Sequence, residues 1–173
     1  MKKKFNLILI LLFFCFCFFV FFQALNNSNV YIPNNISGKV LSDFKGIKLE
    51  NKEVVNSEDL FSGNDYYLLN IWASWCLPCR KEHSILMEIK DNNKIKLIGI
   101  NYKDNELSAK KFLIKNGNPF SEIIQDKDGM ISINLGAYGV PETYLINKKR
   151  KIIKKFVGQL NKNSIKEIKL LLK

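Results

Sequence analysis

Hydrophobic residues are distributed unevenly along the chain. Between residues 5 and 22 nearly every position is apolar, whereas the later part has short apolar runs separated by polar, Gly and Pro residues. The first pattern is typical of a membrane-spanning helix, which needs about 20 apolar residues. The second is typical of one compact domain. We therefore expect a membrane anchor at 1–25, an Asn-rich linker at 26–38 and a domain at 39–173.

The residues before the apolar run predict its orientation. Lys2, Lys3 and Lys4 favour a cytoplasmic N-terminus and a domain on the outer side of the membrane. A cleaved signal peptide and a lipoprotein processed at Cys15 or Cys17 are the alternatives. The run is long for a signal peptide, and both cysteines lie in its middle, so the pattern favours a retained anchor with these cysteines as apolar filler.

Within the domain, the spacing of apolar residues predicts alternating strands and helices. The expected strands are an extended lead-in at 43–51, then 66–72, 95–101, 123–124, 143–146 and 152–157. The expected helices are a turn at 57–60, then 77–91, a helix starting after residue 104 or 105 and ending before 117, a turn at 129–135, and a last helix from 164.

Polar residues mark several of the helix starts. Ser57 is expected to cap its helical turn, and Asp104 or Asn105 the helix that ends before residue 117. Ser164 and Glu167 have the spacing of a capping box, which places the start of the last helix there.

The order β-α-β-α followed by a β-hairpin and a helix predicts an α/β fold, a central mixed sheet flanked by helices on both faces. The strand at 66–72 is expected in the middle of the sheet. Residues that follow it then emerge at the carboxyl edge, where open α/β sheets handle ligands.

The chain is strongly basic, with a formal net charge of +11. Nearly all the cations are lysines, and they are scattered rather than clustered. The sequence therefore argues against nucleic-acid binding, and a basic surface remains compatible with anionic lipid or acidic partners.

Cys76 and Cys79 are the most informative residues, because two cysteines separated by two residues can form and break a disulfide. They lie where a strand passes into a helix, and unpaired N–H groups and the helix dipole there favour a thiolate. We expect Cys76 to be the exposed nucleophile and Cys79 the resolving thiol. Structural zinc needs four ligands, and the domain offers only one further candidate, His83.

Pro141 lies just before an expected strand and is a candidate for a cis peptide bond. A cis bond would let Val140 offer its backbone N–H and C=O to an extended peptide. A simple loop proline is the alternative on local sequence alone.

Several motifs together resemble one family. They are WASWCLPCRKEH at 72–83, GINYKD at 99–104, GNP at 117–119, DG at 128–129 and GAYGVPET at 136–143. They resemble the thioredoxin superfamily and, more closely, the membrane-anchored DsbE/CcmG proteins of cytochrome c maturation. The resemblance covers residues 49–161. The basic turn at 148–151 departs from it, because a Gly-containing turn is common there.

The resemblance implies a thioredoxin fold, a cis Pro141 and a reductant role in the periplasm. Such a protein is held in the bacterial inner membrane by one helix and needs no cofactor or metal beyond its redox-active disulfide. It reduces apocytochrome c or a haem-handling partner, and a membrane electron carrier of the DsbD/CcdA type reduces it in turn.

The resemblance also implies roles for two acids. Asn70 stands where thioredoxin carries a buried acid, so another carboxylate is needed to move the proton of the inner thiol. Glu82, one turn after Cys79, and Glu142, after Pro141, are the candidates for proton transfer or pKa tuning. An acid beside the thiolate would raise the thiol pKa and favour the dithiol. An ordinary exposed position on the helix is the alternative for Glu82.

Other residues are candidates for binding the client protein. Tyr102 and Tyr138 are candidates for lining a groove, whereas packing or solvent contact is favoured for His83. The residues expected to bind substrate are Trp75, Val140, Pro141 and Thr143.

Three functions are compatible with these residues. The first is a reductant in cytochrome c maturation, and the second is a general periplasmic thiol reductase or oxidase with other clients. The third is a Cu(I)-binding module using the two sulfurs, since thiolates suit that ion. The lack of a second histidine argues against the third.

Overall fold

The computed structural model describes residues 2–26 and 36–172, in two compact units. The first holds helix α1 (Lys2–Asn26), in which the 22 residues Lys4–Leu25 are long and apolar enough to cross a membrane. The predicted linker, 26–38, lies largely outside the described residues. Its residues 36–38 already belong to the second unit, because the Gly38 N–H donates to the Ile152 carbonyl at 2.7 Å.

The second unit alternates strands and helices, as the sequence predicts. Its elements are β1 (Lys45–Lys48), β2 (Val54–Asn56), α2 (Ser57–Leu60), β3 (Tyr66–Trp72), α3 (Leu77–Lys90), β4 (Ile95–Tyr102), α4 (Glu106–Asn116), β5 (Glu122–Asp126), α5 (Met130–Asn134), β6 (Glu142–Asn147), β7 (Ile152–Val157) and α6 (Lys162–Leu171).

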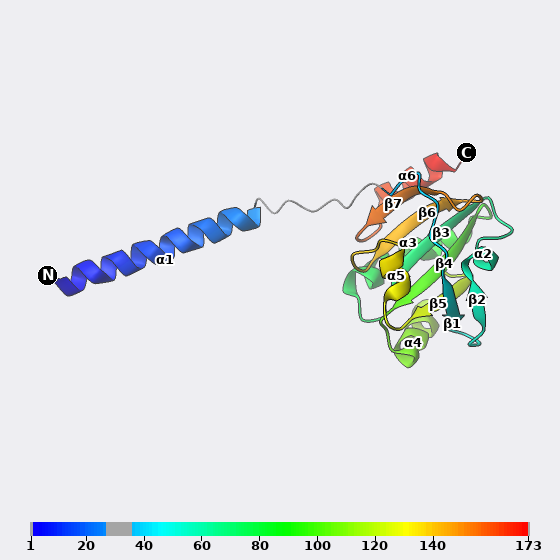
Figure 1. The fold of residues 1–173 in the computed structure, drawn as a ribbon, viewed down its shortest axis with the longest axis horizontal. Coiled ribbons are helices and arrows are strands. Elements are labelled where there is room, and N and C mark those ends of the chain that lie inside the picture. Colours follow the sequence, from blue (N-terminus) through cyan, green and yellow to red (C-terminus); the bar gives the residue numbers. More distant parts are fainter. Residues whose placement is uncertain (1, 27–35, 173) are drawn as a thin grey trace. The chain divides into compact units, whose positions relative to one another are not determined.

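The strands form one mixed sheet in the order β2-β1-β5-β4-β3-β6-β7 (Figure 1). β3, β4 and β5 run parallel, and the remaining neighbours pair antiparallel. β3 lies between β4 and β6, so six of its seven residues are buried. This confirms the predicted mixed sheet and the predicted inner position of the strand before the cysteines.

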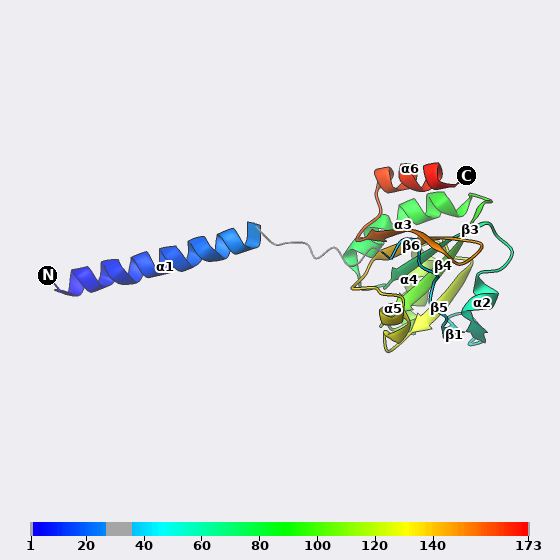
Figure 2. The same ribbon diagram turned by 45° about the horizontal axis from the view of Figure 1, so that its top comes forward.

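Helices cover both faces of the sheet (Figure 2). Because side chains alternate along a strand, β3 sends Leu68 to one face and Leu69 to the other. Leu68 joins the apolar cluster that contains Leu86 of α3 and Ile165 of α6. Leu69 joins the opposite cluster, with Leu60 of α2. The active-site helix α3 is therefore fixed against one face of the central strand.

The lead-in differs from the expected single extended segment. β1 pairs antiparallel with both β2 and β5, and so adds a hairpin to the edge of the sheet. Ser57 does not cap α2 as predicted, because its hydroxyl accepts the Phe44 N–H and donates to Asp43. Asn56 occupies the cap position without a side-chain cap bond.

The last helix starts earlier than predicted. Asn161, rather than Ser164, is the N-cap of α6, and its side chain accepts the N–H groups of Asn163 and Ser164. The Ser164 hydroxyl in turn accepts the Asn161 N–H at 3.2 Å. The reciprocal bonds of a capping box are present, but three residues upstream of the predicted pair Ser164 and Glu167.

The basic turn between β6 and β7 forms without glycine. Arg150 adopts a left-handed backbone with φ of 59°, a conformation that glycine usually provides. The Asn147 side chain accepts the N–H groups of Lys149 and Lys151, which closes the turn around it. The guanidinium of Arg150 is anchored on the Leu41 carbonyl and on Asp43. The hairpin geometry thus survives the departure from the family's turn.

The position of the α6 cap can be tested. Asn161→Ala should lower the free energy of unfolding by about 1 kcal/mol, because two N–H groups lose their acceptor. Glu167→Ala should cost less, since Glu167 makes only a half-exposed ion pair with Lys154. Urea denaturation of both variants measures the difference, and an equal loss would contradict the cap at Asn161.

Candidate active site

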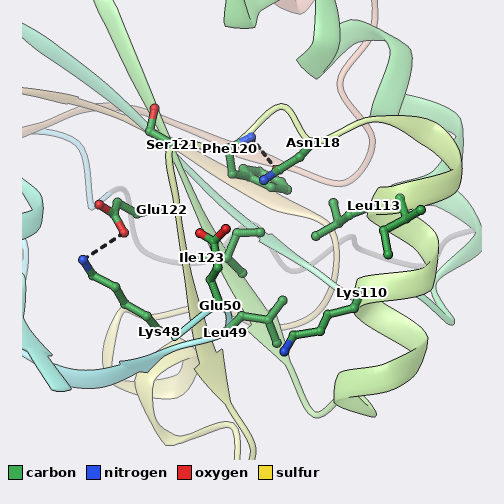
Figure 3. Close-up of a pocket in the computed structure, with 11 residues that line it drawn as sticks. Lys48, Leu49, Glu50, Lys110, Leu113, Asn118, Phe120, Ser121, Glu122 and Ile123 are labelled. Carbon is green, nitrogen blue, oxygen red and sulfur yellow. Dashed lines mark hydrogen bonds and ion pairs between the residues drawn. The ribbon is translucent and has the colours of Figure 1, made fainter. Parts of the chain in front are cut away.

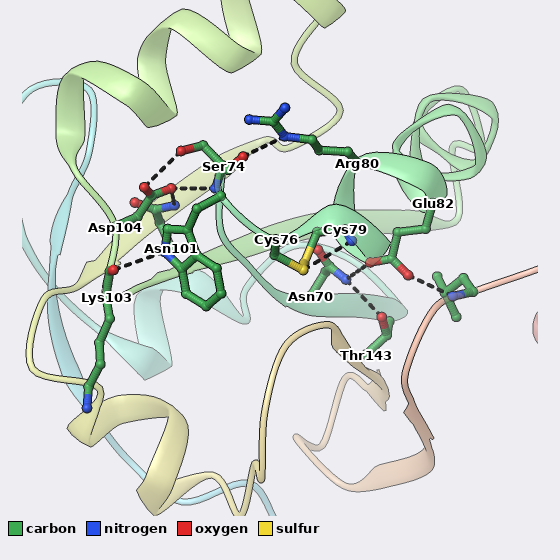
Figure 4. Close-up of a disulfide and its surroundings, with 12 residues drawn as sticks. Asn70, Ser74, Cys76, Cys79, Arg80, Glu82, Asn101, Lys103, Asp104 and Thr143 are labelled. Carbon is green, nitrogen blue, oxygen red and sulfur yellow. Dashed lines mark hydrogen bonds between the residues drawn. A yellow bond between two sulfur atoms is a disulfide. The ribbon is translucent and has the colours of Figure 1, made fainter.

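Cys76 and Cys79 form a disulfide where β3 passes into α3 (Figure 4). Cys76 is the N-cap of α3, and its Sγ accepts the Cys79 N–H at 3.1 Å. Pro78 lies in the first turn, where its missing N–H costs nothing. The Cys79 N–H and the helix dipole would stabilise a Cys76 thiolate after reduction. The predicted setting of the pair is confirmed.

The exposure of Cys76 differs from the prediction. In the disulfide, Cys76 is 3% exposed and Cys79 is 4% exposed. Ring closure turns both sulfurs toward each other inside an apolar cluster, against which Val140 packs. The expectation of an exposed nucleophile is therefore wrong for the oxidised protein.

Asp104 fixes the loop that precedes the disulfide. Its carboxylate accepts the backbone N–H of Ser74 at 2.5 Å, the Ser74 hydroxyl at 2.8 Å and the Asn101 amide at 3.0 Å. The Asn105 N–H donates to it at 2.8 Å, while Asn105 itself caps α4. The sequence pointed to Asp104 only as a helix cap. Its contact with Ser74 could have been predicted from the strand order, since Ser74 and Asp104 follow neighbouring parallel strands and therefore lie at the same edge of the sheet.

Two further bonds hold the same loop. Arg80 Nε donates to the Ser74 carbonyl at 2.7 Å, from one turn into α3. Trp75 Nε1 donates to the Lys103 carbonyl at 3.1 Å, which leaves its ring lying on the surface and 55% exposed. Trp75, which directly precedes Cys76, is thus partly exposed, as expected.

Glu82 is fully buried, unlike an ordinary helix residue. Its Oε1 accepts the Asn70 amide at 2.9 Å, and its Oε2 accepts the Leu160 N–H at 2.7 Å. Burial raises the pKa of Glu82 to about 7, although the two hydrogen bonds act in the opposite direction. A carboxyl group one turn from Cys79 can therefore exchange a proton near neutral pH.

Asn70 connects this acid to β6. Its amide also donates to the Thr143 hydroxyl at 2.9 Å, and its Oδ1 is buried without a partner. Thr143 itself is completely buried. The structure thus places the Thr143 side chain beneath the site, where it cannot line a client groove, because β6 turns it inward toward Asn70.

The loop before β6 carries the other expected binding residues. The Val140–Pro141 peptide bond is cis, as predicted. Val140 is partly buried and packs against both apolar clusters of the domain. Tyr138 is 61% exposed on the same loop. Val140 therefore packs on the apolar cluster that contains Cys76.

Glu142 is also buried, but its surroundings differ from those of Glu82. It accepts the Tyr138 N–H at 2.9 Å and the Tyr144 hydroxyl at 3.2 Å, and it forms an ion pair with Lys155 at 2.7 Å. Burial, with the Glu142 charge alongside, raises the pKa of Tyr144 well above its ordinary value. Lys155 was not predicted from the sequence, because only the pairing of β7 with β6 brings it beside Glu142.

The remaining candidates take packing roles. His83 is buried, and its Nε2 lies 3.0 Å from the Gly117 carbonyl, with the ring edge-on to Phe112. Tyr102 is partly buried, with the Lys103 ammonium over its ring. Within residues 2–26 and 36–172, His, Cys, Asp and Glu form no group of three that could hold a metal ion.

A cavity of about 350 Å³ lies apart from the disulfide, between α4 and β5 (Figure 3). Leu113, Phe120 and Ile123 form its apolar wall, and the Lys48–Glu122 ion pair, at 3.3 Å, stands at its rim. Neither cysteine lines it, so it is not part of the redox site.

Comparisons with known proteins agree with this geometry. The model of the Redoxin family matches residues 36–171. The chain is 34% identical over 165 residues to the thiol:disulfide interchange protein DsbE of Escherichia coli (strain K12), covering 93% of this chain and 89% of that protein. It is 43% identical over 100 residues to the thiol:disulfide interchange protein CycY of Rhizobium leguminosarum bv. viciae, covering 58% and 54%.

A solved structure shows the same fold. The thioredoxin domain of a thiol-disulfide oxidoreductase from Bacteroides vulgatus is similar with a TM-score of 0.67 at 20% identity, covering 79% of this chain and 98% of that one. The expected thioredoxin fold is confirmed.

The Asp104 network should be needed for stability. Asp104→Asn keeps the shape of the side chain but replaces one acceptor oxygen by an NH₂ donor that faces other donors. The free energy of unfolding should therefore fall by about 1–3 kcal/mol. Asp65→Asn is the matched control, because Asp65 makes only an exposed ion pair with Lys148. Chemical denaturation compares the two, and equal small losses would contradict the network's importance.

The raised pKa of Glu82 predicts a pH dependence of stability. The folded protein binds this proton more tightly than the unfolded chain, so the contribution is complete below the unfolded pKa and is lost as pH rises through about 7. For the oxidised protein, Glu82→Gln should remove up to about 3 kcal/mol of the stability difference between about pH 4 and pH 8. Urea denaturation across this pH range measures it.

Glu88→Gln is the control for this pH series, since Glu88 lies on the same helix but is exposed. If the two variants and the parent protein had parallel pH profiles, Glu82 would not titrate as described.

Proposed function

The chain belongs to the Redoxin family and is a thiol:disulfide oxidoreductase, and from this premise we propose that it is a membrane-anchored periplasmic reductant of cytochrome c maturation. Its proposed clients are disulfides in apocytochrome c or in haem-handling partners. The observation that carries the proposal is the Cys76–Cys79 pair at the start of α3, with the Cys79 N–H directed at Cys76 Sγ. The cytochrome c assignment rests on the DsbE/CcmG-type motifs and on the identity to DsbE.

The reaction transfers two electrons from the reduced pair to the client. The Cys76 thiolate attacks one sulfur of the client disulfide, forms a mixed disulfide and releases the other client sulfur as a thiolate, which takes up a proton. Cys79 then loses its proton and attacks Cys76 Sγ, and the first client sulfur leaves and is protonated. The disulfide in the structure is the product state of this sequence.

Glu82 is the proposed acceptor of the Cys79 proton. It lies one turn after Cys79 on α3, and its pKa of about 7 matches a group that exchanges protons at neutral pH. The unpartnered Oδ1 of Asn70, which is hydrogen bonded to Glu82 through its amide, can accept from a neighbouring thiol in the reduced protein. With a pKa of about 7, both forms of Glu82 are populated near neutral pH, and the ionised form is the one that can take the Cys79 proton.

The proposed client site is the surface around the disulfide. Trp75 offers an exposed aromatic face, and Val140 offers its backbone just before the cis Pro141, whose own carbonyl already accepts the Gly158 N–H at 2.9 Å. No described residue forms a hydrogen bond with the Val140 backbone, so it can pair with an extended peptide.

The proposed location is the bacterial inner membrane, with one span, a cytoplasmic N-terminus and a periplasmic domain. The apolar helix Lys4–Leu25 and the lysines that precede the apolar run support it. A reductant on that side needs a supply of electrons, and a membrane dithiol carrier of the DsbD/CcdA type would regenerate the Cys76 and Cys79 thiols.

The client can be identified by trapping. In Cys79→Ser the second attack cannot occur, so mixed disulfides between Cys76 and clients should accumulate in membranes that contain the full chain. We expect a haem-maturation component or an apocytochrome c, released by excess dithiol and identified by mass spectrometry. The double variant Cys76→Ser, Cys79→Ser should trap nothing.

Two results would contradict the proposal. Recovery of unrelated secreted enzymes alone would indicate a general thiol reductase. A reduction potential near that of strong oxidants, about −120 mV, rather than toward that of thioredoxin, about −270 mV, would indicate an oxidase.

A further inference from the structure

Lys155 is an unusual lysine in this basic domain, because its side chain is only 10% exposed. Its partner Glu142 has a side chain that is 2% exposed, and the charged atoms lie 2.7 Å apart. In each of the other ion pairs between described residues, one side chain is at least 28% exposed. A charge is buried at a cost unless it is paired, so this position requires a matched cation and anion.

The surroundings of the Lys155 ammonium are complete. Besides Glu142, it donates to the Gly136 carbonyl at 2.8 Å. The ring centroids of Tyr138 and Tyr144 lie 4.8 Å and 5.4 Å away, in the range of cation–π contacts. The strand register creates this arrangement, because Lys155 of β7 lies opposite Tyr144 of β6, on the face that Glu142 also shares.

These contacts hold the loop 136–141 at two of its residues and at the residue that follows it. Lys155 binds its first carbonyl, at Gly136, and through Glu142 it fixes the N–H of Tyr138. Glu142 itself follows the loop directly. The segment that remains without such a hold is Gly139 and Val140, next to the disulfide. Lys155, on a different strand, thus holds the part of the loop before Gly139 and Val140, and on the other side the Pro141 carbonyl accepts the Gly158 N–H at 2.9 Å.

The same contacts separate the roles of the two buried acids. Glu82 has neutral donors as hydrogen-bond partners, whereas the charge of Glu142 is balanced by Lys155 and shared with Tyr144. Glu142 is thus suited to fasten a loop rather than to act as a free acid beside the thiols.

We propose that Lys155 is a positioning residue for client recognition, which holds the loop 136–141 so that Val140 can pair with an extended peptide that carries the target disulfide. The inference rests on the proposed function, because it concerns the same site. It predicts that Lys155 matters for peptide disulfides and much less for small disulfides, which need only the Cys76 sulfur.

The test compares two substrates with the full chain in detergent. One is a synthetic peptide of about ten residues with a single disulfide, and the other is the small disulfide dithiobis(nitrobenzoate). In Lys155→Met, the ratio of kcat/KM for the peptide to that for the small disulfide should fall at least about tenfold, chiefly through a higher KM, since a displaced loop loses binding geometry. Lys155→Arg should restore most of the ratio.

Two variants guard against a loss of folding. Lys154→Met is the matched control, because Lys154 makes a half-exposed pair with Glu167, and it should leave the ratio unchanged. The double variant Lys155→Met, Glu142→Gln removes both charges, so no unpaired charge is buried, and its ratio should be as low as that of Lys155→Met.

The outcomes are distinguishable. If Lys155→Met and the double variant retain the parental ratio, or if both substrates slow equally, the positioning role is refuted. If the parent protein itself exchanges with neither substrate, the proposed function fails instead.

Discussion

The whole site depends on the short connection between β3 and α3. Burial of β3 between β4 and β6 fixes its carboxyl end, and the packing of α3 on one face fixes the direction in which the helix starts. Cys76 is held at that start, where helix N–H groups have no intrahelical partner. The bonds from Ser74 to Asp104 and to Arg80 leave this short connection little freedom. The redox chemistry therefore follows from the packing of one strand and one helix.

The fold gives its two buried glutamates, Glu82 and Glu142, different partners. Glu82 faces only neutral donors, so desolvation dominates and the group keeps its proton up to about neutral pH. Glu142 lies 2.7 Å from the Lys155 ammonium, so this buried carboxyl group has a cationic partner. These surroundings support the proposed division, in which Glu82 exchanges protons near the inner sulfur and Glu142 holds the loop before β6. Similar residues near one site thus acquire separate tasks from their neighbours.

The sequence predicted those parts of the structure that depend on local signals. The continuous apolar run of β3, the start of α3 at the cysteines and the cis Pro141 were all predicted from nearby residues or motifs. One miss is local, since Asn161 rather than Ser164 caps α6, but the others depend on contacts between distant segments. The β2 strand exists because β1 has an edge to pair with, and Lys155 is buried because of its register with β6. The burial of Cys76 in the disulfide also comes from the surrounding apolar cluster, which is assembled from distant segments.

The pKa of Glu82 also bears on the proposed exchange reaction. A permanently ionised carboxylate near the sulfurs would oppose the Cys76 thiolate and slow its attack, whereas a permanently neutral one could not take the Cys79 proton. A pKa of about 7 lies between these limits, because burial and two donors act against each other. Near neutral pH both forms are populated, and in the proposed reaction the ionised form takes the Cys79 proton. Asn70 binds Glu82 through a neutral amide, which does not fix the charge of the carboxyl group. The buried acid that thioredoxin carries at this position, or a cation there, would favour one charge state of Glu82.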